Sequence, residues 1–339
     1  MKLALYEDSS VFDALKDEWN TLLSHSTSDL IFCTWEWQST WWKTYEAGRL
    51  WVITCRDDAD QLIAIAPWFV EHNPDERVLR TIGCVDVTDY VDIIAHVDHV
   101  DRIHDALASF VTEHHTAFDR INLCNIPEVS PTTTSFLKKL QDCGFEAEIV
   151  LQEVCPVIEL PDTFEEYLAS LDKKQRHEIR RKQRRAEAEA EVEWYVVGPE
   201  HDLQQEMEGF LALMAASHPE KAKFLDNPRN LAFFHNFMPV TFARGWLKLS
   251  FLKINGKAAA TYCDFDYGNR ILVYNSGLLP DWYGHLSAGI VLLTRNIRDA
   301  IDSKRAIFDF LRGDETYKYR MGAKDTRVFK LRARMPAAA

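Results

Sequence analysis

Residues 305–322 read RAIFDFLRGDETYKYRMG, and this segment has the most informative pattern of residues in the chain. The apolar run 306–308 is short and dense, which is typical of a strand that is buried on both faces. A carboxylate, Asp309, interrupts the run before it resumes with Phe310. Because burying an unpaired carboxylate is costly, Asp309 is predicted either to pair with a cation or to act in binding or catalysis.

This stretch, with the strand, loop and helix that precede it, resembles the C-terminal signature of GNAT-type acyltransferases. The branch is the CelD-like (BioF2-like acetyltransferase) family, which is related to FemABX-like tandem GNAT proteins. The resemblance covers nearly the whole chain and is sharpest from about 171 to 322. It implies an α/β (α+β) fold with two tandem GNAT-like domains, each a mixed, mostly antiparallel sheet flanked by helices.

Turn signals and hydrophobic periodicity repeat the same order of elements in the two halves of the chain. In the second half they predict a helix over 164–190, a hairpin turned by Asn255 and Gly256, a strand at 270–276 and a helix at 288–301. The predicted domains are therefore 1–160 and 161–335. Only the second half carries the signature, so the resemblance places the acyl-CoA site there and implies a non-catalytic first domain.

Bulk composition narrows the function. A chain of 339 residues suggests about two domains, and its net charge of −13 argues against a nucleic-acid binder over the whole surface. No apolar run approaches the roughly 20 residues of a membrane span, and the first residues lack a basic and then apolar signal peptide. We therefore expect a cytoplasmic protein without a membrane span.

The seven cysteines are scattered and never occur at metal-ligand spacing. Most stand in apolar surroundings, as Cys124 and Cys263 do. They are interpreted as free core thiols in a reducing cytoplasm, and no metal site is predicted.

The loop 278–289, LLPDWYGHLSAG, stands before the helix predicted at 288–301. The resemblance implies that its backbone N–H groups bind the diphosphate of acetyl-CoA or another acyl-CoA. Unpaired amides at the amino end of a helix attract anions, and glycine lets a phosphate approach closely. The candidate cofactor-binding residues are Gly284, His285, Leu286, Ser287, Ala288 and Gly289. The loop lacks the basic or amide residue and closely spaced glycines of the commonest GNAT loops.

Three residues are candidate catalytic groups, each with a structural alternative. Asp309 would position or deprotonate the acceptor, or else pair with a cation such as Arg312 or Lys318. Tyr317 would protonate the leaving thiolate, as the family implies, or else pack its helix. His218, in a polar break between helices, would act as a base near neutral pH, or else lie on the surface.

Between residues 173 and 185 there are eight Lys or Arg side chains and a single strongly apolar one, Ile179. We expect a solvated helix whose basic end faces the site, so Arg180 joins Arg312 and Lys318 as a candidate substrate-binding residue. A comparable segment opens the second domain of FemABX-like enzymes, which receive tRNA-borne donors. The segment has no interleaved aromatic residues for base stacking, so we expect no nucleic-acid partner.

Residues 114–119, HHTAFD, match the HHxxxD signature of a different acyltransferase superfamily, in which the second histidine is the base. No DFGWG-like partner motif follows, and the pair falls at the end of a predicted helix. There cationic histidines suit the helix dipole. A structural role for His115 and Asp119 is therefore predicted.

These observations predict an acyl-CoA-dependent N-acyltransferase that moves an acetyl or longer acyl group to an amine of a small molecule, sugar or lipid precursor. No metal cofactor is expected, and the sequence indicates no oligomeric state. One alternative is a FemABX-like transferase that uses aminoacyl-tRNA. Another is a degenerate GNAT pair that binds without catalysis, which the unusual loop at 284–289 would suit.

Overall fold

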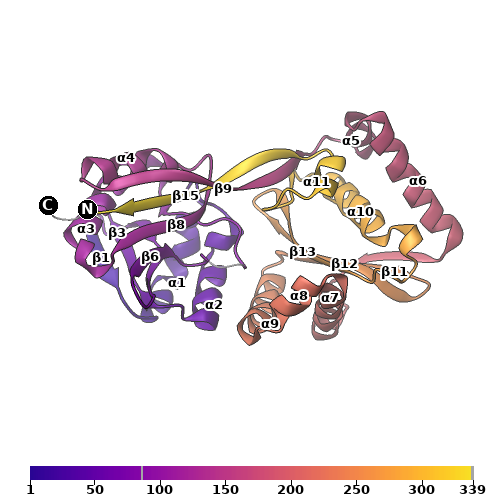
Figure 1. Ribbon diagram of the computed structural model, residues 1–339, viewed down its shortest axis with the longest axis horizontal. Coiled ribbons are helices and arrows are strands. Elements are labelled where there is room, and N and C mark those ends of the chain that lie inside the picture. The colour runs from indigo at the N-terminus through magenta and orange to yellow at the C-terminus, as the bar shows by residue number, and fades with distance from the viewer. Residues whose placement is uncertain (85–86, 337–339) are drawn as a thin grey trace. The chain divides into compact units, whose positions relative to one another are not determined.

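The chain forms two compact units in the computed structural model, which describes residues 1–84 and 87–336 (Figure 1). The first unit comprises Met1–Val154 and Arg327–Ala339, and the second comprises Cys155–Thr326. The second unit is therefore inserted into the first. The chain leaves the first unit along β9 (Glu146–Glu159) and returns along β15 (Lys324–Arg334).

This division differs from the domain ranges expected from the sequence. The sequence predicts a domain boundary after residue 160 and assigns the last strand to the second domain. In the structure the boundaries between the two units fall after Val154 and after Thr326. Alternation of apolar residues marks a strand but does not reveal its partner. The last strand pairs with β8 (Arg120–Pro127) of the first unit, with Leu331 opposite Leu123.

The first unit contains two sheets flanked by helices. An antiparallel sheet has the order β1-β3-β4-β7, and a second, mixed set of strands has the order β15-β8-β6-β5-β2. Its remaining elements are β1 (Lys2–Tyr6), α1 (Ser10–Leu23), η1 (Ile31–Cys33), α2 (Trp35–Tyr45), β2 (Arg49–Leu50), β3 (Val52–Arg56), β4 (Leu62–Ala66), β5 (Trp68–His72), β6 (Arg77–Thr81), β7 (Ile94–Ala95), η2 (Val97–His99), α3 (Val100–Glu113), η3 (His115–Ala117), η4 (Pro131–Thr133) and α4 (Ser135–Asp142).

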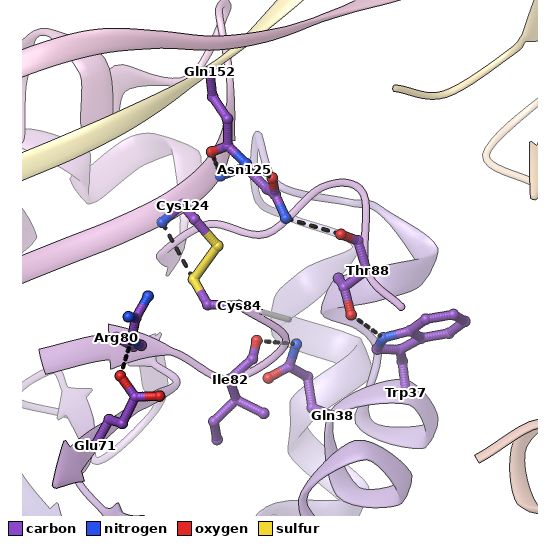
Figure 2. Close-up of a disulfide and its surroundings, with 10 residues drawn as sticks. All are labelled: Trp37, Gln38, Glu71, Arg80, Ile82, Cys84, Thr88, Cys124, Asn125 and Gln152. Carbon is purple, nitrogen blue, oxygen red and sulfur yellow. Dashed lines mark hydrogen bonds and ion pairs between the residues drawn. A yellow bond between two sulfur atoms is a disulfide. The ribbon is translucent and has the colours of Figure 1, made fainter. Parts of the chain in front are cut away.

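A disulfide joins Cys84 to Cys124 in the first unit, so the prediction that all cysteines are free thiols is wrong for this pair (Figure 2). Cys124 lies in β8, and Cys84 follows β6, the strand that pairs in parallel with β8. That register brings together two cysteines that are 40 residues apart in the sequence, which spacing alone could not show. The other five are free, and all of them but Cys143 are buried.

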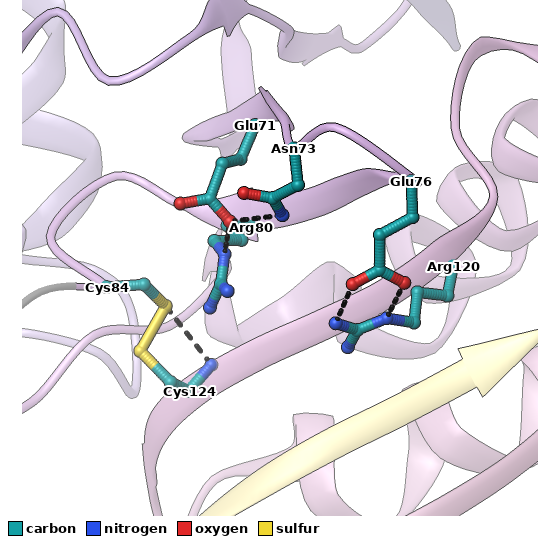
Figure 3. Close-up of polar contacts among 7 residues, drawn as sticks. All are labelled: Glu71, Asn73, Glu76, Arg80, Cys84, Arg120 and Cys124. Carbon is teal, nitrogen blue, oxygen red and sulfur yellow. Dashed lines mark hydrogen bonds and ion pairs between the residues drawn. A yellow bond between two sulfur atoms is a disulfide. The ribbon is translucent and has the colours of Figure 1, made fainter.

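Polar contacts hold Thr88 against two other parts of the first unit. Asn125 donates from its side-chain amide to the carbonyl of Thr88, and the indole N–H of Trp37 donates to the Thr88 hydroxyl at 3.1 Å (Figure 2). Nearby, the carboxylate of Glu76 pairs with two nitrogens of Arg120 (Figure 3). The side chains of that ion pair are about one-third exposed, so it contributes little to stability.

The second unit is a mixed sheet with the order β10-β11-β12-β13-β14, to which β9 adds its last residues. Helices α7, α8 and α9 lie on one side of this sheet, and α5, α6 and α10 lie on the other (Figure 1). The elements are α5 (Phe164–Ser170), α6 (Lys173–Glu189), β10 (Val192–Val196), α7 (Leu203–Ser217), α8 (Pro219–Leu225), α9 (Pro228–Ala243), β11 (Leu247–Ile254), β12 (Lys257–Tyr267), β13 (Arg270–Leu278), η5 (Gly284–Leu286), α10 (Ala288–Asp302), β14 (Ile307–Asp309) and α11 (Thr316–Arg320).

Each unit is thus a mixed, mostly antiparallel β structure flanked by helices, which confirms the predicted α/β (α+β) class. The predicted hairpin is present, with Asn255 and Gly256 both at positive φ as a tight hairpin turn requires. The single helix predicted over 164–190 is two helices. The chain breaks at Asp172, whose carboxylate caps α6 by accepting from the backbone N–H of Gln175.

Hydrophobic side chains of α10 and of the sheet face that it covers form one hydrophobic core cluster of the second unit. The face of α10 that meets the sheet supplies Val291, Leu292 and Ile297, and all three are buried. No helix among the described residues is both long and apolar enough to cross a membrane.

Candidate active site

Strands β13 and β14 lie side by side and run parallel, but they pair only from Arg270 opposite Ile307 to Leu272 opposite Asp309. Beyond that point β14 ends, while β13 continues to Leu278. Among the described residues, the rest of β13 has no strand partner on that side. The edge of β13 beyond Leu272 therefore lies outside its pairing with β14, where a ligand that contains amides can approach it.

The loop after β13 leads directly into the amino end of α10. Gly284, His285 and Leu286 form the short η5, Ser287 has a left-handed backbone, and Ala288 and Gly289 are the first residues of α10. The Ser287 side chain makes no capping hydrogen bond, and the backbone N–H of Ile290 already donates to the Ser287 carbonyl. The amides of Ala288 and Gly289, at the start of α10, therefore have no intrahelical acceptor and no side-chain cap. These amides and the helix dipole favour an anion.

At both glycines of this loop, Gly284 and Gly289, the surrounding protein leaves room for a larger residue. A side-chain carbon added to Gly284 would meet nothing within 4 Å, and one added to Gly289 would make an ordinary contact of 3.5 Å with Leu278. The backbone at Gly284 is therefore accessible, and the first turn of α10 lies against the end of β13. The imidazole of His285 instead pairs with Glu189 at 3.1 Å.

Lys221 of α8 is a functional candidate that the sequence analysis missed. Its ammonium donates to the carbonyl oxygen of Ser276 at 2.5 Å, in the part of β13 that extends beyond its pairing with β14. Burial lowers the pKa of Lys221 to about 8, although the nearby Glu315 carboxylate favours the charged form. A lysine with this pKa is partly neutral near physiological pH and can accept a proton.

Tyr317 of α11 packs against the hydrophobic core of the second unit, with its ring 6.0 Å from that of Phe310. Burial raises the pKa of Tyr317 far above its ordinary value, and the carboxylates of Glu315 and Asp264 add to the effect. The Tyr317 hydroxyl therefore remains protonated at neutral pH and can donate a hydrogen bond. The pKa of Tyr262, a buried residue of β12, is also raised by burial and by Tyr317, so the two phenols interact.

Asp309 is 1% exposed at the end of β14. One of its carboxylate oxygens accepts from the backbone N–H of Leu311 at 2.8 Å, and the other lies 3.9 Å from the guanidinium of Arg270. The structure therefore pairs Asp309 with a cation of β13.

Lys318 is buried inside the loop that follows β14. Its ammonium donates to the carbonyls of Arg312 at 2.8 Å and Gly313 at 3.0 Å, and it pairs with Glu315 at 2.8 Å. The side chain is only 3% exposed. These contacts occupy the ammonium and hold the turn in which Gly313 has positive φ, so Lys318 organises the loop.

The structure separates the remaining candidate residues. His218 is exposed and caps α8, since its ring accepts from the backbone N–H of Glu220. Arg180 is an exposed residue of α6 and pairs with Glu165 at 2.8 Å. His218 stands immediately before the helix that carries Lys221.

The HHTAFD segment has local structural contacts in the first unit. The ring of His115 lies 2.8 Å from the carbonyl of Thr112. Asp119 accepts from the backbone N–H of Arg77 at 2.7 Å and pairs with its guanidinium at 2.8 Å, which lowers the pKa of the carboxyl. Both residues thus serve the junction between α3 and β8.

Comparisons with known proteins agree with this geometry. Residues 173–319 match the family described as acetyltransferase (GNAT) domain. No curated protein matches the sequence. Among solved structures, FemX has a TM-score of 0.66 at 11% identity, with 97% of each chain covered. L-PGS from Bacillus licheniformis has a TM-score of 0.56 at 9% identity, covering 95% of this chain and 92% of that one.

A tandem GNAT protein from the clavulanic acid biosynthesis pathway has a TM-score of 0.50 at 9% identity, with 100% of each chain covered. Identities this low establish a shared fold and nothing about substrates. Residues 173–319, which include the end of the pairing between β13 and β14 and the start of α10, are similar to an acetyltransferase (GNAT) domain.

Proposed function

We propose that the protein is an acyl-CoA-dependent N-acyltransferase whose active site lies in the second unit. The observation that carries the proposal is the early end of the pairing between β13 and β14, beside the uncapped amino end of α10. A pantetheine arm needs an open strand edge for its amides, and a diphosphate needs free N–H groups. In this region the edge of β13 beyond Leu272 and the N–H groups of Ala288 and Gly289 would serve these purposes.

The donor would be held mainly by backbone groups. Amides of the segment from Gly284 to Gly289 would bind the diphosphate, and the edge of β13 beyond Leu272 would bind the pantetheine amides. The loop contains no Lys or Arg, so the helix end and the amides supply the attraction. Metal chemistry has no part in the proposal.

Lys221 and Tyr317 would assist the chemistry. The nitrogen of the acceptor amine would attack the thioester carbonyl while the carbon–sulfur bond breaks, and neutral Lys221 would take the proton that this nitrogen loses as its bond to the carbonyl carbon forms. The buried Tyr317 hydroxyl would donate to the departing sulfur, which leaves as the thiol of coenzyme A after protonation. Positioning of the two substrates would supply most of the acceleration.

The acceptor is proposed to be an amine on a small molecule, sugar or lipid precursor. Lys221 approaches β13 from α8, on the side of the sheet that α7 to α9 cover, so the amine would enter from that side. A half-buried, partly neutral lysine suits an uncharged or weakly cationic acceptor better than a strongly cationic one.

The test is release of thiol from acetyl-CoA in the presence of a panel of amines, with mass spectrometry of the products. We expect amine-dependent thiol release and an acyl amide product. Two results would contradict the proposal: no rise in melting temperature at millimolar coenzyme A, and no product with any acyl-CoA.

An aminoacyl-tRNA-dependent reaction is the second candidate, because α6 presents many basic side chains. It predicts transfer from charged tRNA without any effect of coenzyme A. A protein that binds coenzyme A but shows no turnover with either donor would instead be a non-catalytic GNAT pair.

A further inference from the structure

A groove of about 940 Å³ lies between α6 and α10, with Trp194 of β10 in its lining. Strands β10 and β14 are at opposite ends of the strand order from β10 to β14. The groove therefore lies at the β10 end of the sheet, whereas the proposed acyl-transfer site lies at the β14 end. Nothing in the proposed chemistry uses it.

Guanidinium groups enter this groove from both helices. Arg180 and Arg184 come from α6, and Arg295 and Arg298 come from α10. Among the residues that the structure describes, Arg184 and Arg298 have no carboxylate partner. The side chain of Arg184 donates only to a carbonyl of its own helix, and that of Arg298 stacks 4.2 Å from the ring of Phe164.

Three other arginines line the groove, of which Arg181 pairs with Glu178 of its own helix at 2.6 Å. The remaining two have partners that an anion can replace. Arg295 pairs with Glu187 at 3.1 Å and Arg180 pairs with Glu165 at 2.8 Å. Both carboxylates are mostly exposed, at 57% and 73%. Exposed ion pairs contribute little to the free energy of folding. Displacing these carboxylates therefore costs an entering anion little binding free energy.

The composition of the groove favours a compact anion over a nucleic-acid strand. Glu187, Asp299 and Asp302 are part of its lining and would repel a continuous phosphate backbone. Its lining has two aromatic rings, an exposed His177 and Trp194, whose indole N–H donates to Asn296, whereas single-stranded nucleic acids need rows of stacking rings. The volume lies in the range of small-molecule sites.

We propose that the groove between α6 and α10 binds a small phosphate ester, chiefly through Arg184 and Arg298. Guanidinium groups match the oxygens of a phosphate with paired hydrogen bonds, and the two arginines face the groove from opposite helices. This site is separate from the acyl-transfer site. It would give a function to the basic segment 173–185 of α6, which takes no part in the proposed acyl transfer.

The test is calorimetric titration of the full chain with inorganic pyrophosphate. We expect the double variant Arg184→Gln/Arg298→Gln to bind about 10-fold more weakly or worse, since two charge-assisted contacts are lost. The control is Lys173→Gln/Lys174→Gln, which removes the same charge from α6 outside the groove and should bind as the wild type does. Equal losses in both variants would overturn the proposal in favour of a general charge effect.

Two further arms separate the other sources of binding. Pyrophosphate should still bind to a Gly284→Asp variant; if it does not, the anion sits at the amino end of α10 and the groove proposal fails. A single-stranded RNA that requires Arg184 and Arg298 and resists displacement by pyrophosphate would overturn the proposal in favour of a nucleic-acid site. Absence of wild-type binding at about 10 mM pyrophosphate would also overturn it.

Discussion

The ammonium of Lys221 lies 2.5 Å from the carbonyl oxygen of Ser276, on the part of β13 that β14 leaves unpaired. A lysine on a short helix thus reaches the edge of a central strand. Burial at this place lowers its pKa to about 8. The contact joins the acceptor side of the proposed site to the strand that would hold the donor.

Lys221→Met should lower kcat/KM for the acceptor amine by about 100-fold, the usual contribution of a general base. Lys221 is active when neutral, and its neutral fraction grows as pH rises through about 8. Wild-type kcat/KM should therefore rise with pH and level off above that value, and the variant should lose this dependence. The matched control is Lys223→Met, an exposed residue of the same helix. A pH profile shared by both variants would contradict the role of Lys221.

Gly284→Asp should weaken binding of coenzyme A without harming the fold. The new side chain has space, and a carboxylate before the amino end of α10 suits the helix dipole while it repels a diphosphate. Thermal melts with and without coenzyme A would measure both effects. Gly284→Asn, which has nearly the same shape without the charge, should retain much more of the ligand-induced rise. Equal behaviour of the two variants would argue against a diphosphate at this place.

Asp309→Asn distinguishes a structural carboxylate from a catalytic one. We expect a loss of about 1–3 kcal/mol in the free energy of unfolding, because a buried acceptor loses its charge. Activity per folded molecule should stay within a few-fold. Arg270 is one-third exposed, so its guanidinium can still reach water. Urea melts and thiol release measure the two quantities, and a large loss of activity at unchanged stability would make Asp309 catalytic.

His115→Ala should leave turnover within a few-fold of the wild type. Its ring contacts the carbonyl of Thr112, and its motif partner Asp119 is occupied by Arg77. Steady-state kinetics at matched folded concentration is the measurement. A loss of about three orders of magnitude, the upper range for a general base, would move the active site to the first unit.

Removal of the Cys84–Cys124 bond should destabilise the first unit. A cross-link across 40 residues contributes about 2–4 kcal/mol, chiefly by restricting the unfolded chain. Cys84→Ala/Cys124→Ala should therefore melt lower than the oxidised wild type, and Cys143→Ala should not. Mass spectrometry of peptides from non-reduced protein checks the linkage directly, and its absence after oxidising purification would contradict the pairing.

The parts of the fold that sequence reasoning could predict are those encoded by local patterns. The apolar run at 306–308 becomes β14 in part, and Asn255 with Gly256 turns the predicted hairpin. The helix at 288–301 appears as α10 with nearly the same bounds. Periodicity, turn chemistry and capping act over a few residues, so one sequence is enough to detect them.

The parts that could not be predicted depend on partners distant in the chain. Lys221 stands in a polar segment and shows no local sign of burial; only the packing of α8 near β13 gives it a lowered pKa. Likewise, Lys318 looks like a surface cation until the turn at Gly313 brings three carbonyls to it. The pairing of Cys84 depends on the register of β6 and β8.

The insertion of the second unit within the first has a consequence for synthesis on the ribosome. The chain emerges from its amino end, and the strand that pairs with β8 comes from its last residues. Until that strand emerges, the first unit lacks Leu331 and Ala333, which fill its core. The inserted unit has its whole sequence available earlier. We therefore expect the second unit to fold first during translation, the reverse of the usual order from the amino end.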